Sequence, residues 1–307
     1  MRIVFFGTPE FAVPSLEALT AEGAQVVGVV TQPDKPQGRS RSTLVPPPVK
    51  VAALRLGLPV LQPERPVGDL FHAALKHHQA ELGVVVAYGH LLKPEMLAIP
   101  PRGMINVHAS LLPALRGAAP INWAILRGDA ETGVSIMQMA KGMDSGPVLH
   151  RLTTPIGPGD TAGALTARLA TLGAVALIEA LALQRLGRLT PMPQDAALAT
   201  FAPKIDRATA RLDWSEDAGA IARRIRAFDP APGAWTTLHE REVKFFGVRP
   251  APGGGPPGRI LDVRNALVIG TVAGAIEIAE VRPAGRARMS AADWLRGRGA
   301  MPGETFA

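Results

Sequence analysis

The sequence predicts an α/β protein in two parts, an open, mostly parallel sheet followed by a smaller domain rich in short strands. Three observations predict this fold class. Short, nearly continuous apolar runs alternate with helical patterns from the first residue to about residue 190. A proline-rich stretch then ends the alternation, and short β-like runs separated by Gly and Pro follow it. The length of 307 residues fits two domains, at roughly 100–200 residues for each.

The apolar runs of the first part are typical of strands that are buried on both faces of a parallel sheet. The segment between the first two runs, residues 11–23, fits a helix that ends at Gly23. Residues 165–189 indicate a long apolar helix. In an open sheet of this kind, ligands bind beyond the carboxyl ends of the strands. The predicted strands are residues 3–6, 26–31, 83–87, 104–107 and 134–139.

The pattern changes after Gly187. Residues 190–206 are rich in proline and weakly periodic, so we predict a linker there, between domains at residues 1–189 and 207–307. Residues 217–228 indicate one more helix. Short strands with tight spacing predict a small barrel after it. These strands are residues 234–238, 242–248, 259–263, 267–271 and 275–280.

Composition excludes several classes of protein. An apolar fraction of 47% with 19% charged residues is typical of a globular chain, not of a disordered or fibrous one. The absence of cysteine excludes disulfides, thiolate metal ligands and thiol nucleophiles, and favours a reducing cytoplasm. We expect no signal peptide and no membrane span, since the apolar runs are short. The net charge of +7 fits either a mildly basic surface or a polyanionic partner.

Two motifs suggest cofactors that the context does not favour. GGGPPG at residues 253–258 matches the letters of a dinucleotide fingerprint, but two prolines remove N–H donors and the flanks are β-like. The turn after the first predicted strand lacks the second glycine of that fingerprint, so we do not expect a nicotinamide cofactor. A polar helix carries four potential metal ligands whose spacing does not suit a metal, and we expect no metal site. These ligands are His72, His77, His78 and Glu81.

The stretch 103–125 carries the residues with the clearest chemistry. Asn106 and His108 are two residues apart on a predicted strand, so both side chains face the same side, near the carboxyl end. Asp144 lies in a turn after a neighbouring strand. An amide can support a developing oxyanion, His can transfer a proton, and Asp can fix the tautomer of the His and stabilise its cation. A lone Asn-x-His is more often structural, but together the three residues favour direct acyl transfer to an amine without a covalent enzyme intermediate.

A second irregular stretch, residues 33–50, holds five prolines, two arginines and two lysines. A loop of this length inside an α/β domain is usually functional or disordered. A basic loop beside the carboxyl end of a strand can grip phosphate. The sequence leaves open whether this stretch binds a partner or is only a surface excursion.

With these residues, the chain resembles the methionyl-tRNA formyltransferase family. The segments that match include FFGTPEFAVPSL (5–16), INVHASLLPALRGAAPI (105–121), GMDSGPVL (142–149) and IRAFDPAPGAW (225–235). The resemblance implies a Rossmann-like formyltransferase fold with a C-terminal OB-like β-barrel that binds tRNA. It implies 10-formyltetrahydrofolate as the formyl donor and the α-amino group of methionyl initiator tRNA as the acceptor. It also implies a cytoplasmic monomer that acts in translation initiation.

The resemblance also implies roles for particular residues. The catalytic residues would be Asn106, His108 and Asp144. The segment that contacts the folate would be Ser110, Leu111, Leu112 and Pro113. The segment that holds its pterin would be Val86, Ala87 and Tyr88. The residues that grip tRNA would be Arg39, Arg41 and Lys50.

Three other functions compete with this one. A sugar-nucleotide N-formyltransferase would share the catalytic residues and the folate pocket. It is disfavoured by the basic loop at 33–50, by the segment 226–235 and by the basic C-terminal half. A non-catalytic tRNA-binding protein would not need Asn106, His108 and Asp144. A nicotinamide-dependent oxidoreductase would need the fingerprint that the chain lacks.

Overall fold

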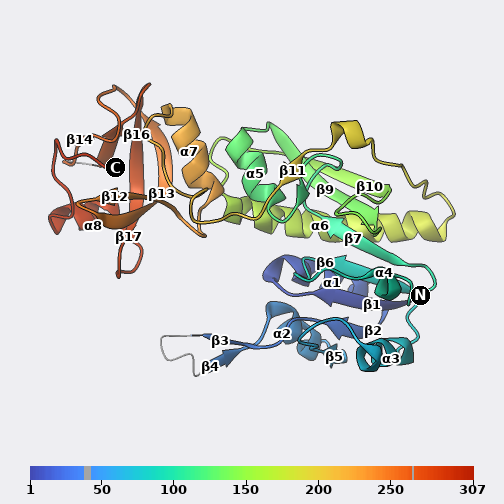
Figure 1. The fold of residues 1–307 in the computed structure, drawn as a ribbon. Helices are drawn as coiled ribbons and strands as arrows, with labels where there is room; N and C mark the ends of the chain where they lie inside the picture. The colour runs from blue at the N-terminus through green and yellow to red at the C-terminus, as the bar shows by residue number, and fades with distance from the viewer. Residues whose placement is uncertain (38–42, 265) are drawn as a thin grey trace. The chain divides into compact units, whose positions relative to one another are not determined.

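The structure is a computed structural model that describes residues 1–37, 43–264 and 266–307. The chain divides into two compact units that alternate along the sequence (Figure 1). The N-terminal unit comprises Met1–Pro120, Thr132–Thr154 and Thr166–Ala202. The C-terminal unit comprises Ile121–Glu131, Pro155–Leu165 and Pro203–Ala307.

A seven-stranded sheet with the order β10-β9-β7-β6-β1-β2-β5 forms the N-terminal unit. The pairs β2–β5, β1–β2, β1–β6 and β6–β7 are parallel, and β9 runs antiparallel to β7. The prediction of an open, mostly parallel sheet is therefore confirmed. The strands are β1 (Arg2–Gly7), β2 (Gln25–Val30), β5 (Val60–Leu61), β6 (Leu82–Val86), β7 (Met104–His108), β9 (Glu131–Gln138) and β10 (Val148–Pro155).

The strand order reverses between β1 and β6. From β1 the chain runs outward through β2 to β5, and it then returns to β6 on the other side of β1. The carboxyl ends of strands at such a reversal form the crevice in which open α/β sheets bind ligands. Here the two ends are joined by a hydrogen bond of 2.8 Å that the Thr8 hydroxyl donates to the Tyr88 carbonyl. The carboxyl end of β7 lies beside that of β6, on the same edge.

Helices follow the strands up to residue 185. The longest, α6, approaches β7 so closely that a Cβ on Gly173 would lie 2.9 Å from Val107 Cγ1. Val107 therefore faces α6, and Asn106 and His108 project from the opposite face of β7. The helices are η1 (Glu10–Ala12), α1 (Val13–Ala21), α2 (Pro48–Arg55), α3 (Asp69–His77), α4 (Pro94–Leu97), α5 (Pro120–Arg127) and α6 (Ala162–Arg185).

Among the described helices, α6 is long and apolar enough to cross a membrane, judged by length and composition alone. Half of its most apolar window is buried inside the protein. Burial of this kind is common for the core helix of a globular domain. At Gly173, α6 packs against Val107 and Val134 of the sheet.

The basic stretch 33–50 is more regular than the sequence indicates. Its described parts form an antiparallel ribbon of β3 (Lys35–Gln37) and β4 (Thr43–Val45), and α2 follows. Residues 38–42 lie outside the described residues, and these include Arg39 and Arg41, two of the predicted tRNA-binding residues.

An antiparallel sheet with the path β12-β13-β16-β15-β14 dominates the C-terminal unit, and β17 pairs with β16. This half-barrel is consistent with the predicted OB-like domain. Trp214 and Phe245 pack their rings against Phe306 near the C-terminus. Asp217 caps α7 by accepting from the backbone N–H of Ala220. The elements are α7 (Ala218–Ala227), β12 (Ala234–Leu238), β13 (Arg241–Ala251), β14 (Ile260–Asp262), β15 (Leu267–Gly270), β16 (Ala275–Pro283), β17 (Met289–Ser290) and α8 (Ala291–Arg296).

Candidate active site

Asn106 lies in the middle of β7, with Val85 of β6 on one side and Met137 of β9 on the other. Its side chain is partly exposed, unlike those of its neighbours in the strand. Within the described residues, no group hydrogen bonds to the Asn106 amide. The amide is therefore available to donate to a ligand at this edge of the sheet.

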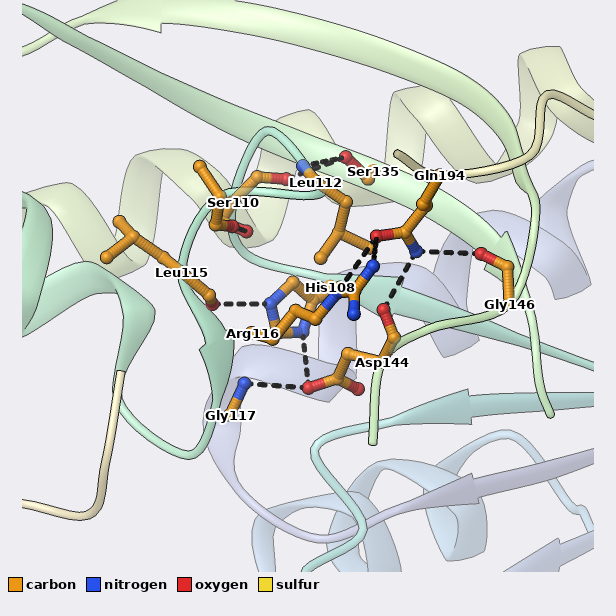
Figure 2. Close-up of polar contacts among 11 residues, drawn as sticks. His108, Ser110, Leu112, Leu115, Arg116, Gly117, Ser135, Asp144, Gly146 and Gln194 are labelled. Atoms are coloured by element: carbon orange, nitrogen blue, oxygen red, sulfur yellow. Dashed lines mark hydrogen bonds and ion pairs between the residues drawn. The ribbon is translucent and has the colours of Figure 1, made fainter. Parts of the chain in front are cut away.

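His108 ends β7 and is buried, with 6% of its surface exposed. Its Nε2 lies 3.1 Å from the Leu115 carbonyl oxygen (Figure 2). Since a carbonyl only accepts, Nε2 carries the proton, and in the neutral ring Nδ1 carries the lone pair. Nδ1 is 3.7 Å from Asp144 Oδ2, within ion-pair range but longer than a hydrogen bond. The tautomer is thus set by Leu115 and not, as we expected, by Asp144.

Asp144 follows β9 in a turn where its own backbone is left-handed, with φ of 46°. Its Oδ2 accepts a hydrogen bond of 2.8 Å from the backbone N–H of Gly117. The same oxygen faces His108, so the backbone donor aims the carboxylate at the imidazole (Figure 2). A cationic His108 would gain Coulomb energy from this carboxylate in a largely buried setting.

The loop that holds His108 is itself held by residues that we predicted to be a linker. Leu115 is left-handed, with φ of 57°, and its N–H donates to the Thr200 hydroxyl at 2.9 Å. The Thr200 carbonyl accepts from the Arg116 N–H at 2.9 Å. Two short parallel strands continue this pairing, β8 (Arg116–Gly117) and β11 (Phe201–Ala202). Residues 190–202 therefore belong to the N-terminal unit, and Thr200 in this range holds the loop after His108.

Gln194 is another residue at this candidate site that the sequence analysis missed. Its amide contacts Arg116 on one side, and the turn of Asp144 and Gly146 on the other (Figure 2). A glutamine in a proline-rich stretch carries no periodicity or spacing that marks it as functional. Only the folded chain brings it to residues that are 48 to 78 positions away.

The predicted folate segment after His108 is mostly structural in its side chains. The Ser110 hydroxyl is buried and donates to the Ala114 carbonyl at 2.6 Å. Leu112 is 1% exposed and packs in a small apolar cluster with Met137. Leu111 and Pro113 are partly exposed. This segment can offer a ligand Leu111, Pro113 and its backbone.

The predicted pterin segment also combines buried side chains with exposed backbone. Val86 and Tyr88 are buried, and Tyr88 lies in the apolar core of the N-terminal unit. Ala87 and Gly89 between and after them are exposed and left-handed, with φ of 46° and 85°. Because the side chains point inward, a ligand at this edge would meet backbone groups of Ala87 and Gly89.

Lys50, the described member of the predicted tRNA-binding residues, lies in the first turns of α2. Its ammonium forms an ion pair of 2.7 Å with Asp34. Gln62 also donates to Asp34, and these hydrogen bonds, with that of Gln62 the largest influence, hold the pKa of the Asp34 carboxyl below its usual range. Lys50 thus anchors the base of the β3–β4 ribbon.

Metal ligands do not gather within the described ranges, where no group of three His, Asp or Glu residues is placed to hold an ion. His77 and His78 of the polar helix contact each other edge-on, with ring centroids 6.4 Å apart.

Comparison with known proteins agrees with the fold. Residues 1–181 match the family model for formyl transferase, and residues 204–299 match that for the formyl transferase C-terminal domain. A methionyl-tRNA formyltransferase from Roseobacter denitrificans is 47% identical over 306 residues, covering 100% of this chain and 99% of the relative. One from Heliobacterium modesticaldum is 46% identical and covers 100% of both chains.

Solved structures with lower identity share the fold. The N-formyltransferase from Helicobacter canadensis, in complex with folinic acid and dTDP-3-aminofucose, superposes with a TM-score of 0.71 at 17% identity, covering 90% of this chain and 98% of that one. HypX from Aquifex aeolicus, in complex with tetrahydrofolic acid, superposes with a TM-score of 0.68 at 22% identity, covering 96% and 47%. Family models that match both parts of the chain, and relatives nearly half identical over the full length, show that this chain belongs to the methionyl-tRNA formyltransferase family.

Proposed function

We propose that this protein acts as a cytoplasmic monomer that transfers a formyl group from 10-formyltetrahydrofolate to the α-amino group of methionyl initiator tRNA. Full-length relatives with this activity in their names support the proposal. The single observation that carries it is the grouping of the Asn106 amide, the His108 imidazole and the Asp144 carboxylate at the carboxyl end of β7. Such a set suits direct transfer between two substrates, because it contains a charge-stabilising donor and a proton carrier without a nucleophilic Ser or Cys.

The donor supplies the formyl carbon, and the acceptor supplies a neutral amine. An α-amino group with a pKa near ~8 is neutral in a substantial fraction of molecules at neutral pH. The Asn106 amide donates to the formyl oxygen as negative charge develops there. A carbon–nitrogen bond to the acceptor forms and the one to the donor breaks. The proton that the acceptor loses passes to the donor nitrogen, with His108 and a water as the path and Asp144 stabilising the cationic ring.

The residues around this edge fit a folate. A flat heterocycle needs backbone hydrogen-bond partners beside apolar surface. The exposed, left-handed backbone at Ala87 and Gly89 offers the first, and the partly exposed Leu111 and Pro113 offer the second. Buried members of the same segments keep that backbone in shape; these are Val86, Tyr88, Ser110 and Leu112.

The acceptor tRNA would contact two basic parts of the chain. Arg39, Arg41 and Lys50 would grip the tRNA, and the ion pair of Lys50 with Asp34 would hold the start of the basic stretch 33–50. The domain at residues 207–307 would add affinity, and residues 190–206 would connect it to the domain at 1–189. In the C-terminal unit, the guanidinium of Arg207 lies 4.3 Å from the centre of the Trp235 ring. Binding through phosphates weakens steeply as salt rises, because counterions are released.

One assay tests the reaction. The protein is incubated with 10-formyltetrahydrofolate and either methionyl initiator tRNA or an amino-sugar nucleotide, and the amine that acquires formyl is identified by mass. We expect formylmethionyl-tRNA. Formylation of the sugar instead would assign the protein to the competing activity.

A second assay tests the tRNA contacts. Arg39→Ala and Arg41→Ala should raise the KM for tRNA, by an amount that shrinks as salt rises, and leave donor affinity unchanged. Arg188→Ala is the matched control, since Arg188 is an exposed arginine outside the ribbon. An equal loss of donor affinity in the Arg39 and Arg41 variants would reject their proposed role.

A further inference from the structure

We propose that Gln194 and Thr200 are positioning residues of the active site, which hold Asp144 and Leu115 on the two sides of His108. Two residues of the segment that sequence patterns mark as a linker would then hold the catalytic residues in place. This inference rests on the proposed function, because it assigns how the site of that reaction is kept in order.

All the hydrogen-bonding groups of the Gln194 amide are engaged. Its Nε2 donates to the carbonyl of Asp144 at 2.8 Å and to that of Gly146 at 2.7 Å. Its Oε1 accepts from Nε and Nη2 of Arg116 at 3.1 and 2.8 Å. A flipped amide would set an NH₂ group against the guanidinium and an oxygen against two carbonyls. The orientation of Gln194 is therefore dictated by its partners.

Gln194 holds a turn in which a non-glycine residue has a left-handed backbone. Asp144 is left-handed, a conformation that costs a non-glycine residue energy and persists where its surroundings enforce it. At Gly146 the turn presses on β9, since a Cβ there would lie 1.8 Å from the Gln138 carbonyl oxygen. With β9 on one side and the Gln194 amide on the other, the turn fixes where the Asp144 carboxylate faces His108 (Figure 2).

Arg116 explains why the residue is a glutamine. Arg116 is buried, with 8% of its surface exposed, and no described carboxylate lies in ion-pair range of its guanidinium. An amide oxygen satisfies two of its N–H groups without neutralising its charge. A glutamate could accept from Arg116 in the same way, but it could not donate to the carbonyls of Asp144 and Gly146. The Gln194→Glu variant therefore separates the two halves of the interaction.

Thr200 acts on the opposite side of the imidazole. Its hydroxyl accepts from the N–H of Leu115, which is left-handed and whose carbonyl accepts from His108 Nε2. The backbone of Thr200 is hydrogen bonded to Arg116 as well. One extended segment thus holds both groups that contact the two ring nitrogens of His108.

The test uses the full chain with both substrates. Gln194→Glu and Gln194→Met should lower kcat by about 10- to 100-fold, because a displacement of about 1 Å at a reacting group can cost about 10²-fold. The KM values for donor and tRNA should change by less than about threefold, since neither residue is a binding group. Thr200→Val should lower kcat in the same way, and Thr200→Ser, which keeps the hydroxyl, should restore it.

Asp195→Ala is the matched control. Asp195 is adjacent to Gln194 and caps only η2 (Ala196–Leu198), by accepting from the Ala197 N–H. Its loss loosens the same segment without touching Asp144 or Leu115, and kcat should stay within about twofold of wild type. Thermal unfolding of every variant identifies those that are folded. If Gln194→Met does not fold, Gln194→Glu and the Thr200 pair decide the question.

Two results would overturn the inference. One is an unchanged kcat in folded Gln194→Glu and Thr200→Val proteins. The other is an equal loss in Asp195→Ala, which would trace the effect to the segment as a whole. The ring ¹⁵N signals of His108, measured without substrates, should change in the Gln194 and Thr200 variants and not in the control. These NMR signals test the positioning roles of Gln194 and Thr200 independently of the substrate. If the wild-type protein formylates another amine, only the proposed function is rejected.

Discussion

Replacing Tyr88 by Phe tests how the edge of the sheet is built. Tyr88 is the single tyrosine in the chain, and its side chain is 1% exposed. Its ring contacts Phe6 edge-on, with centroids 5.5 Å apart. No described residue hydrogen bonds to its buried hydroxyl, and burial raises the pKa of this hydroxyl to about 12. Tyr88→Phe removes the hydroxyl and keeps the ring.

The structure predicts two effects of different size at different pH. At neutral pH a buried polar group without a partner costs about 1–3 kcal/mol, so the variant should be more stable by an amount in that range. In the unfolded chain the phenol ionises near its usual ~10, whereas in the folded protein it keeps its proton until about 12. Rising pH therefore favours unfolding of the wild type, by about 1.4 kcal/mol per pH unit above ~10. The Phe variant lacks this loss.

Urea unfolding from pH 7 to about 11, on both proteins, measures the difference. Tyrosinate absorbance in the folded wild type reports Tyr88 alone. Ser15→Ala is the control, because Ser15 carries a second buried hydroxyl without a described partner that does not ionise in this range. It should stabilise the protein at neutral pH without an alkaline component. Titration of Tyr88 near ~10, or an identical pH dependence in both proteins, would refute the reasoning.

Three further substitutions test the site and its support. Asn106→Ala should lower kcat by about 10²- to 10³-fold and leave the melting temperature nearly unchanged, because the amide hydrogen bonds to no described residue. A folded variant that shows normal turnover in steady-state kinetics would exclude charge stabilisation by Asn106. In Asp144→Asn the side chain still accepts a hydrogen bond from Gly117 but has no charge, so kcat measured at neutral pH should fall by about 10²- to 10⁴-fold. An unchanged rate would show that the carboxylate has no part in proton transfer. Gly173→Ala would bring a methyl group to 2.9 Å from Val107 and should lower the free energy of unfolding by about 1–3 kcal/mol in urea titrations; an unaltered midpoint would contradict the close approach of α6.

Local patterns in the sequence were sufficient for most of the fold. Each long strand and helix that we predicted is present within a few residues of its expected ends, because apolar periodicity is a property of neighbouring positions. Several elements that we did not predict are short, such as β5, β8, β11 and β17, but the eight-residue β10 and α2 were missed as well. Strands of two residues carry no measurable alternation. Nor does periodicity report that β9 runs antiparallel to β7, since strand direction depends on how the chain returns to the sheet.

At the candidate site, too, some features follow from local sequence and others only from the tertiary structure. The sequence by itself determined that Asn106 and His108 lie on the same face of one strand, because residues two apart on a strand share a face. The tertiary structure decided what surrounds them. It turned Tyr88 into the core, paired Lys50 with Asp34, and brought Gln194 to Asp144 across 50 positions of the chain. Contacts of this kind depend on chain reversals between elements, and no local spacing encodes where distant segments meet.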